Sequence, residues 1–144
     1  MGRRLAGWRA LAGGDRLRLL GCAVGLGLVH ASLALLGYKR TLALVERCSR
    51  QPDHRQATGT DLADARALAR LASIASRHGM VEATCLRRSL LLHGWLRRRG
   101  LRPVLQLGVP ETQVPGTPFQ AHAWVELEGE PLFPADAGYR PFTT

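Results

Sequence analysis

The sequence lacks the cysteine patterns that mark metal-binding proteins. Its three cysteines, Cys22, Cys48 and Cys85, are odd in number and far apart, and no C-x-x-C pair or Cys/His cluster occurs. Zinc sites need such clusters at short, regular spacing, so this pattern argues against a zinc site. Isolated cysteines fit reduced thiols in a cytosol, and we therefore expect a cytoplasmic protein.

Acidic residues are also scarce. The chain has 11 Asp and Glu against 20 Lys and Arg, all arginine except Lys39, and its net charge is +9. A basic balance of this size favours anionic partners such as nucleic acid, an acidic membrane surface or an acidic peptide. An arginine-rich genome would produce the same composition, and the two explanations have equal weight. Hydrophobic residues make up 46% of the 144 residues, which rules out disorder and fits one domain.

The longest stretch without a charged side chain is residues 19–38, if His30 is neutral. Twenty such residues can cross a bilayer, and the arginines before them would lie on the cytoplasmic side. Four glycines, His30 and Ser32 weaken this interpretation, and the apolar pattern continues to Val45 without a loop. We favour a buried helix over a membrane span and leave membrane association open. A cleaved signal peptide fits less well, because no small-residue cleavage site closes the run.

A polar segment with proline and glycine, residues 50–59, separates an apolar helical segment, residues 1–50, from residues 60–144. We expect the two parts to pack as one compact domain. Helical periodicity predicts a helix over 62–77, capped by Thr60 or Asp61. A second helix is predicted over 84–99, ending at Gly100.

After Gly100 the apolar pattern changes to the period of a strand. Residues 102–109 and 119–127 alternate, and a turn at Glu128-Gly129 leads to a third strand at 130–133. The fold class predicted is therefore α+β, with a helical N-terminal layer packed against a small antiparallel sheet.

Cys85 and His122 are the residues whose placement suggests chemistry. Cys85 lies in the first turn of a predicted helix, where unpaired N–H groups and the helix dipole favour a thiolate. His122 lies on a predicted strand, from which it can take the thiol proton and later protonate a leaving amine. Considered singly, each residue has a structural explanation, since a free cysteine is often buried and a strand histidine often structural.

A third polar group is needed to orient the histidine. Asp136 is the best candidate, because the hairpin can return it beside His122. Glu126 is the alternative, but it lies four residues along the same strand, roughly 13 Å away at ~3.3 Å per residue, which is too far for contact. Ser89, one turn after Cys85, could line the same pocket. The backbone N–H of Cys85 can supply one oxyanion donor, and the sequence identifies no second.

Three motifs together carry a family resemblance: C-L-R-R-S-L from Cys85, L-x-L-G-V from Leu105, and F-x-A-H-A-W-V-E from Phe119. Over residues 60–136 the chain resembles the transglutaminase-like leader peptidase of lasso-peptide biosynthesis. More closely, it is similar to the stand-alone protease half of the split B protein. The resemblance implies a transglutaminase-like, papain-like fold and a Cys-His-Asp cysteine protease that removes the leader from a ribosomal precursor. It places the nucleophile on Cys85 and the base on His122; Pro134 stands where the family's acid is expected, two residues before Asp136.

The resemblance also implies partners. These are the precursor leader peptide, a separate leader-recognition protein and an asparagine-synthetase-like cyclase, without nucleic acid, metal or nucleotide cofactor. We expect the basic surface, including Arg97, Arg98 and Arg99, to help dock the recognition protein or the precursor. Two other classes stay open. One is a different acyltransferase or protease of the same fold, and the other is a non-catalytic membrane-associated binding protein with Cys85 buried.

Overall fold

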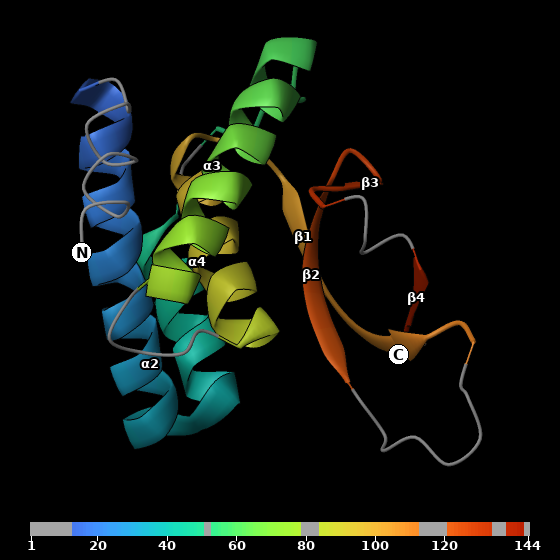
Figure 1. Cartoon of the computed structure of the whole chain (residues 1–144). Coiled ribbons are helices and arrows are strands. Elements are labelled where there is room, and N and C mark those ends of the chain that lie inside the picture. Colours follow the sequence, from blue (N-terminus) through green and yellow to red (C-terminus); the bar gives the residue numbers. More distant parts are fainter. Residues whose placement is uncertain (1–12, 51–52, 79–83, 113–120, 134–137, 143–144) are drawn as a thin grey trace.

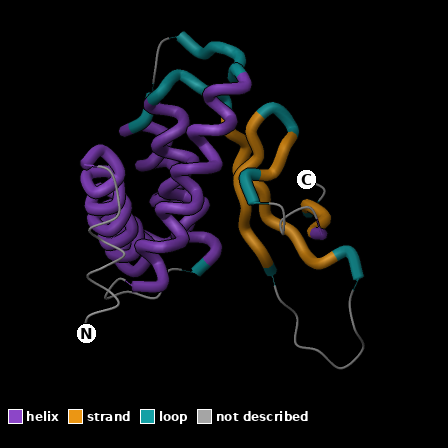
Figure 2. Tube along the Cα trace, turned by 45° about the horizontal axis from the view of Figure 1, so that its top comes forward, coloured by secondary structure: helices purple, strands orange, loops and turns teal. Residues whose placement is uncertain are grey.

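The protein is built from a bundle of helices packed on one small sheet, as the computed structural model shows (Figure 1). The structure describes residues 13–50, 53–78, 84–112, 121–133 and 138–142. The elements in chain order are α2 (Gly13–Cys48), α3 (Gly59–His78), α4 (Cys85–Arg98), β1 (Pro103–Pro110), β2 (His122–Leu127), β3 (Glu130–Pro131) and β4 (Tyr139–Pro141). The helices lie together on one side of the strands (Figure 2). The predicted α+β class is confirmed.

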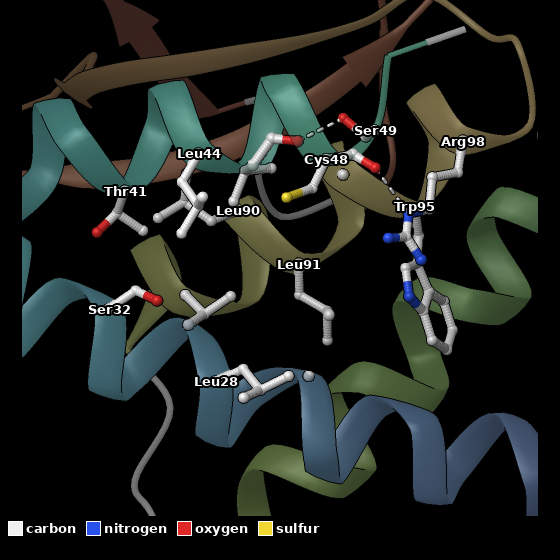
Figure 3. Close-up of a pocket in the computed structure, with 14 residues that line it drawn as sticks. Leu28, Ser32, Thr41, Leu44, Cys48, Ser49, Leu90, Leu91, Trp95 and Arg98 are labelled. Atoms are coloured by element: carbon white, nitrogen blue, oxygen red, sulfur yellow. Dashed lines mark hydrogen bonds between the residues drawn. The ribbon is translucent and has the colours of Figure 1, made fainter.

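Helix α2 consists of two arms that meet at Gly37. That residue has φ 74° and ψ 175°, a backbone conformation open to glycine alone, and it turns the chain so that both arms contact α4 (Figure 3). The helix is long and apolar enough to cross a membrane, although core helices and signal sequences have the same properties. Only 22% of its most apolar window is buried. The expected buried helix is thus buried along one side and exposed along the other.

Helix α3 begins with a reciprocal cap. The backbone N–H of Thr58 donates to Asp61 Oδ2 over 2.9 Å, and the backbone N–H of Asp61 donates to Thr58 Oγ1 over 3.3 Å. Arg55 makes a bidentate ion pair with the same carboxylate. The hydrogen bonds from Arg55 and Thr58 hold the pKa of Asp61 well below its usual range. Thr58 is therefore the N-cap of α3. The predicted N-caps, Thr60 and Asp61, were wrong, because they lie two and three residues after it.

The hydrophobic core lies where the three helices meet the sheet. Small residues of α3 let the neighbouring helices approach closely, and leucines of α4 fill the space against β2. Two glycines of α2 also permit close packing: a Cβ at Gly21 would lie 3.0 Å from the Trp95 ring, and one at Gly25 would collide with Leu91. The core includes Leu26, Ala65, Leu68, Ala69, Ala72, Leu92, Leu96, Val125, Leu127 and Leu132.

The sheet is antiparallel, with strand order β3-β2-β1-β4. Glu128 and Gly129 both have positive φ, 52° and 79°, as the tight turn between β2 and β3 requires. The predicted hairpin is therefore present. β4 was not predicted; it pairs with the far edge of β1, and the sheet curls so that β4 stands across from β2 (Figures 1 and 2).

Candidate active site

Cys85 is the first residue of α4, as predicted. Thr84 before it has the extended backbone of an N-cap, φ −62° and ψ 161°, but its side chain makes no capping hydrogen bond. The first N–H groups of a helix have no partner within the helix, so they surround this position with positive partial charge. The Cys85 side chain is half-buried, which leaves part of it accessible to a substrate.

Ser89, one turn farther along α4, holds the helix to β2. Its Oγ donates a buried hydrogen bond of 2.9 Å to the carbonyl oxygen of Ala123. Carbonyls alternate sides along a strand, and that of Val125 accepts from Leu132 on the β3 side. The Ala123 carbonyl therefore lies on the same edge of β2, beyond the end of β3. Ser89 was expected to line a pocket, and in the structure it anchors the helix to this strand edge.

The same contact determines which part of β2 lies beside Cys85. A tight connection at Gly100, with φ 76°, reverses the chain between α4 and β1, and β2 reverses it again, so α4 and β2 run in the same direction. Four residues back from Ser89 is about 6 Å along a helix. A strand rises about 3.3 Å per residue, so the same distance along β2 covers about two residues and leads back from Ala123 to Ala121. Cys85 thus lies at the end of α4 that is beside the start of β2, near Ala121 and His122 (Figure 1).

His122 lies among aromatic rings. Its ring centroid is 4.2 Å from that of Tyr139 on β4 and 6.0 Å from that of Trp124, which is nearly parallel to it at 14°. On β1 the residue opposite His122 is Gly108. A Cβ there would collide with the Arg140 carbonyl and lie 2.8 Å from the Trp124 ring, so glycine allows β4 and Trp124 to close around this position. The sequence analysis missed Tyr139, because a strand of three residues is too short to show alternation.

Glu126 is held by other partners. Its Oε1 accepts a hydrogen bond of 2.8 Å from the Trp124 indole N–H, and its Oε2 accepts one of 3.2 Å from Gln106. Glu126 therefore positions Trp124, the ring beside His122. Asp136, the preferred third residue, lies outside the described residues.

The three thiols have different surroundings. Cys22 is fully buried in the core, and this burial raises the pKa of its thiol to about 11. Cys48 is exposed near the end of α2, and Cys85 is half-buried. Within the described parts of the chain, no group of three or more His, Cys, Asp or Glu side chains could hold a metal ion. Cys85 is the cysteine that combines partial exposure with a position at a helix start.

A cleft of about 270 Å³ lies on the other side of α4 (Figure 3). Leucines and valines of both arms of α2 line it together with Leu90, Leu91 and Gly94. These α4 positions are rotated by about 100–160° around the helix axis from Ser89, so they lie on another side of the helix. The cleft is therefore separate from the Cys85 and His122 region.

Comparison with known proteins gave one match. A family model described as the transglutaminase-like superfamily matches residues 25–144, a range that includes Cys85, His122 and Asp136. No curated protein and no solved structure matches the chain.

Proposed function

The chain belongs to the transglutaminase-like superfamily, which includes cysteine proteases and acyltransferases, and from this membership we propose that it is a leader peptidase. It cleaves the leader peptide from a ribosomally synthesised lasso-peptide precursor before macrocyclisation. The observation that carries the proposal is the docking of the Cys85 helix on the strand that begins with His122, through Ser89 and Ala123. The motifs around Cys85 and His122 resemble those of the lasso-peptide leader peptidase, and this resemblance is the reason to propose a lasso precursor as the substrate.

In this mechanism His122 takes the Sγ proton of Cys85 as the sulfur attacks the carbonyl carbon of the scissile peptide bond. The oxyanion accepts a hydrogen bond from the unpaired backbone N–H of Cys85 at the helix start. The imidazolium then protonates the departing amine as the C–N bond breaks. Water, deprotonated by His122, hydrolyses the resulting thioester and restores the thiol. Tyr139 and Trp124 hold the imidazole ring in place.

Asp136 orients His122 in this proposal. Tyr139, three residues later in the chain, contacts the His122 ring, and three residues span at most about 11 Å. Glu126 is less suitable because Trp124 and Gln106 already bind its carboxylate. Asp136→Asn should therefore lower kcat by about 10⁴-fold, as loss of the orienting acid does in comparable triads. Glu126→Gln is the matched control and should lower it far less.

The proposed partners are the precursor, a separate leader-recognition protein and the cyclase that closes the ring in the cytoplasm. Basic residues at the end of α4 are a candidate docking surface. Arg98 donates to the Cys48 carbonyl and Arg99 lies 3.7 Å from Asp64, so both are held near the exposed end of the helix. Reversing Arg97, Arg98 and Arg99 to Glu should weaken binding of the recognition protein. Arg70→Glu, on the exposed surface of α3, is the control. If the triple variant bound the recognition protein as tightly as Arg70→Glu does, this docking surface would be excluded.

The direct test is mass spectrometry of a lasso precursor incubated with this protein and its recognition partner. We expect cleavage at one bond, loss of cleavage in Cys85→Ala, and full activity in Cys48→Ala, which removes an exposed thiol elsewhere. A primary amine added to the mixture separates the two superfamily chemistries. Hydrolysis releases a free carboxylate, whereas acyl transfer gives the mass of the amine adduct. Cleavage that survives Cys85→Ala would refute the proposed nucleophile.

A further inference from the structure

The first arm of α2 presents a straight row of exposed apolar side chains, which we name the outer stripe. Its members recur at intervals of three, four and seven residues, so they lie on one side of the helix over about 27 Å. The most exposed, Leu35, Leu17 and Leu28, are 82%, 73% and 65% accessible. The outer stripe consists of Leu17, Leu20, Val24, Leu28 and Leu35.

The opposite side of the same arm packs on the rest of the protein. Leu19, Cys22 and Leu26 belong to the core, and α2 contacts both α3 and α4. The helices separate the first arm of α2 from the sheet, so the outer stripe faces away from the strand that carries His122 (Figure 1). Its exposure is therefore not required by the proposed active site.

Basic residues flank the outer stripe at both ends. Residues 19–38 contain no charged side chain, Arg16 and Arg18 precede them, and Lys39 and Arg40 follow. Within α2 no acidic residue occurs between Asp15 and Glu46. An apolar stripe with cations at both ends matches the interface of an anionic bilayer, where acyl chains bind the leucines and phosphate groups bind the cations. A protein partner would not require this pattern.

We propose that the outer stripe binds the surface of an anionic lipid bilayer, with the first arm of α2 lying along the interface. The arm does not cross the bilayer, because its buried side would then carry α3 and α4 into the hydrocarbon. Those helices bear exposed charges such as Arg66, Arg70 and Arg98, which are costly at that depth. The apolar surface continues from Leu28 to Leu44 at the mouth of the cleft (Figure 3). The bound protein presents its sheet to the cytoplasm.

Sedimentation of the full chain with lipid vesicles tests this proposal. We expect the protein to sediment with vesicles of mixed phosphatidylglycerol and phosphatidylcholine, and about tenfold more weakly with phosphatidylcholine alone. High salt should weaken the binding to the anionic vesicles. Leu17→Ser, Val24→Ser and Leu35→Ser combined should abolish it. The matched control is Ile74→Ser with Val104→Ser, which removes exposed apolar side chains from α3 and β1 and should bind normally.

A second variant tests the proposal even if the triple serine variant fails to fold. Lys39→Glu with Arg40→Glu leaves the outer stripe intact and should remove the preference for anionic vesicles. Failure of the wild-type protein to bind anionic vesicles would overturn the proposal. So would release from cell membranes by detergent but not by alkaline carbonate, which would indicate a membrane span. A dimer that the stripe variant converts to a monomer, without vesicle binding, would instead assign the stripe to a second copy of the chain.

Discussion

Ser89 and Ala123 are joined by a buried hydrogen bond of 2.9 Å, and this bond ties the helix that begins with Cys85 to the strand that begins with His122. The contact uses a strand carbonyl beyond the end of β3, so Ser89 supplies the donor that a neighbouring strand supplies elsewhere in the sheet. Because a helix and a strand are both stiff over this distance, one such bond fixes how far Cys85 is displaced along β2. The proposed chemistry depends on that displacement.

Ser89→Ala should therefore affect both stability and catalysis. Loss of the hydroxyl leaves a buried carbonyl unpaired, which should lower the free energy of unfolding by about 1–3 kcal/mol. A shift of α4 along the strand should lower kcat more than it raises KM. Ser76→Ala is the control, because that hydroxyl bonds a carbonyl of its own helix, α3. Denaturant unfolding and precursor cleavage measure the two effects, and a Ser89→Ala protein with wild-type kcat would contradict this role.

Tyr139 should act on His122 through its ring rather than its hydroxyl. The two ring centroids are 4.2 Å apart, so the tyrosine ring limits the orientations of the imidazole. Tyr139→Ala should lower kcat by about 10- to 100-fold with little change in KM. Tyr139→Phe keeps the ring and should retain most of the activity. Equal losses in the two variants would show that the hydroxyl, and not the ring, is the important group.

Sequence periodicity predicted the elements that carry Cys85 and His122 because both have clear local signals. Gly100 ends α4 with a positive φ, and the turn at Glu128-Gly129 defines the hairpin. The contacts that place the two elements together were not predictable in this way. The Ser89 bond joins residues 34 apart in sequence. β4 has only three residues, and its pairing with β1 depends on the space that Gly108 leaves for the Arg140 backbone.

The N-terminal region shows the same limit. Its long apolar run predicted a helix correctly, but four glycines between residues 19 and 38 gave no sign that only Gly37 breaks it. Helical periodicity also did not separate a buried side from an exposed apolar one, because both sides consist of small or aliphatic residues. The third catalytic residue stays a prediction from the sequence and the resemblance, since Asp136 lies outside the described residues.

The three thiols should react at different rates with a thiol reagent at neutral pH. Cys22 should react slowest, because burial both blocks the reagent and raises the pKa of its thiol to about 11. Cys48 is exposed and should react at the ordinary rate of a free thiol. Cys85 should react fastest, because it is the proposed nucleophile. Proteins that retain one cysteine each, labelled and followed by mass, give the order. A Cys85 slower than Cys48 would count against its role as nucleophile.

His93 should make stability fall in mild acid. Its imidazole is buried on α4, and burial, followed by the nearby Arg97 charge, lowers its pKa from 6.5 to about 4. Glu46, whose carboxylate oxygen is 3.9 Å from Nε2, is only partly able to offset this. Above pH 6.5 the histidine is neutral in the folded and unfolded states, so it adds no pH dependence. Between pH 6.5 and 4 the unfolded chain binds a proton that the folded protein excludes, and stability falls as pH falls.

The full loss should be about 3 kcal/mol, reached below pH 4, where both states are protonated, and constant from there down. Other groups also titrate in this range, so the quantity to measure is the difference between wild type and His93→Leu. On acidification, the free energy of unfolding of His93→Leu should fall by about 3 kcal/mol less than that of the wild type. His54→Gln, in the loop before α3, is the control and should follow the wild-type profile. Parallel profiles for wild type and His93→Leu would mean that the imidazole takes up its proton over the same pH range in the folded and unfolded states.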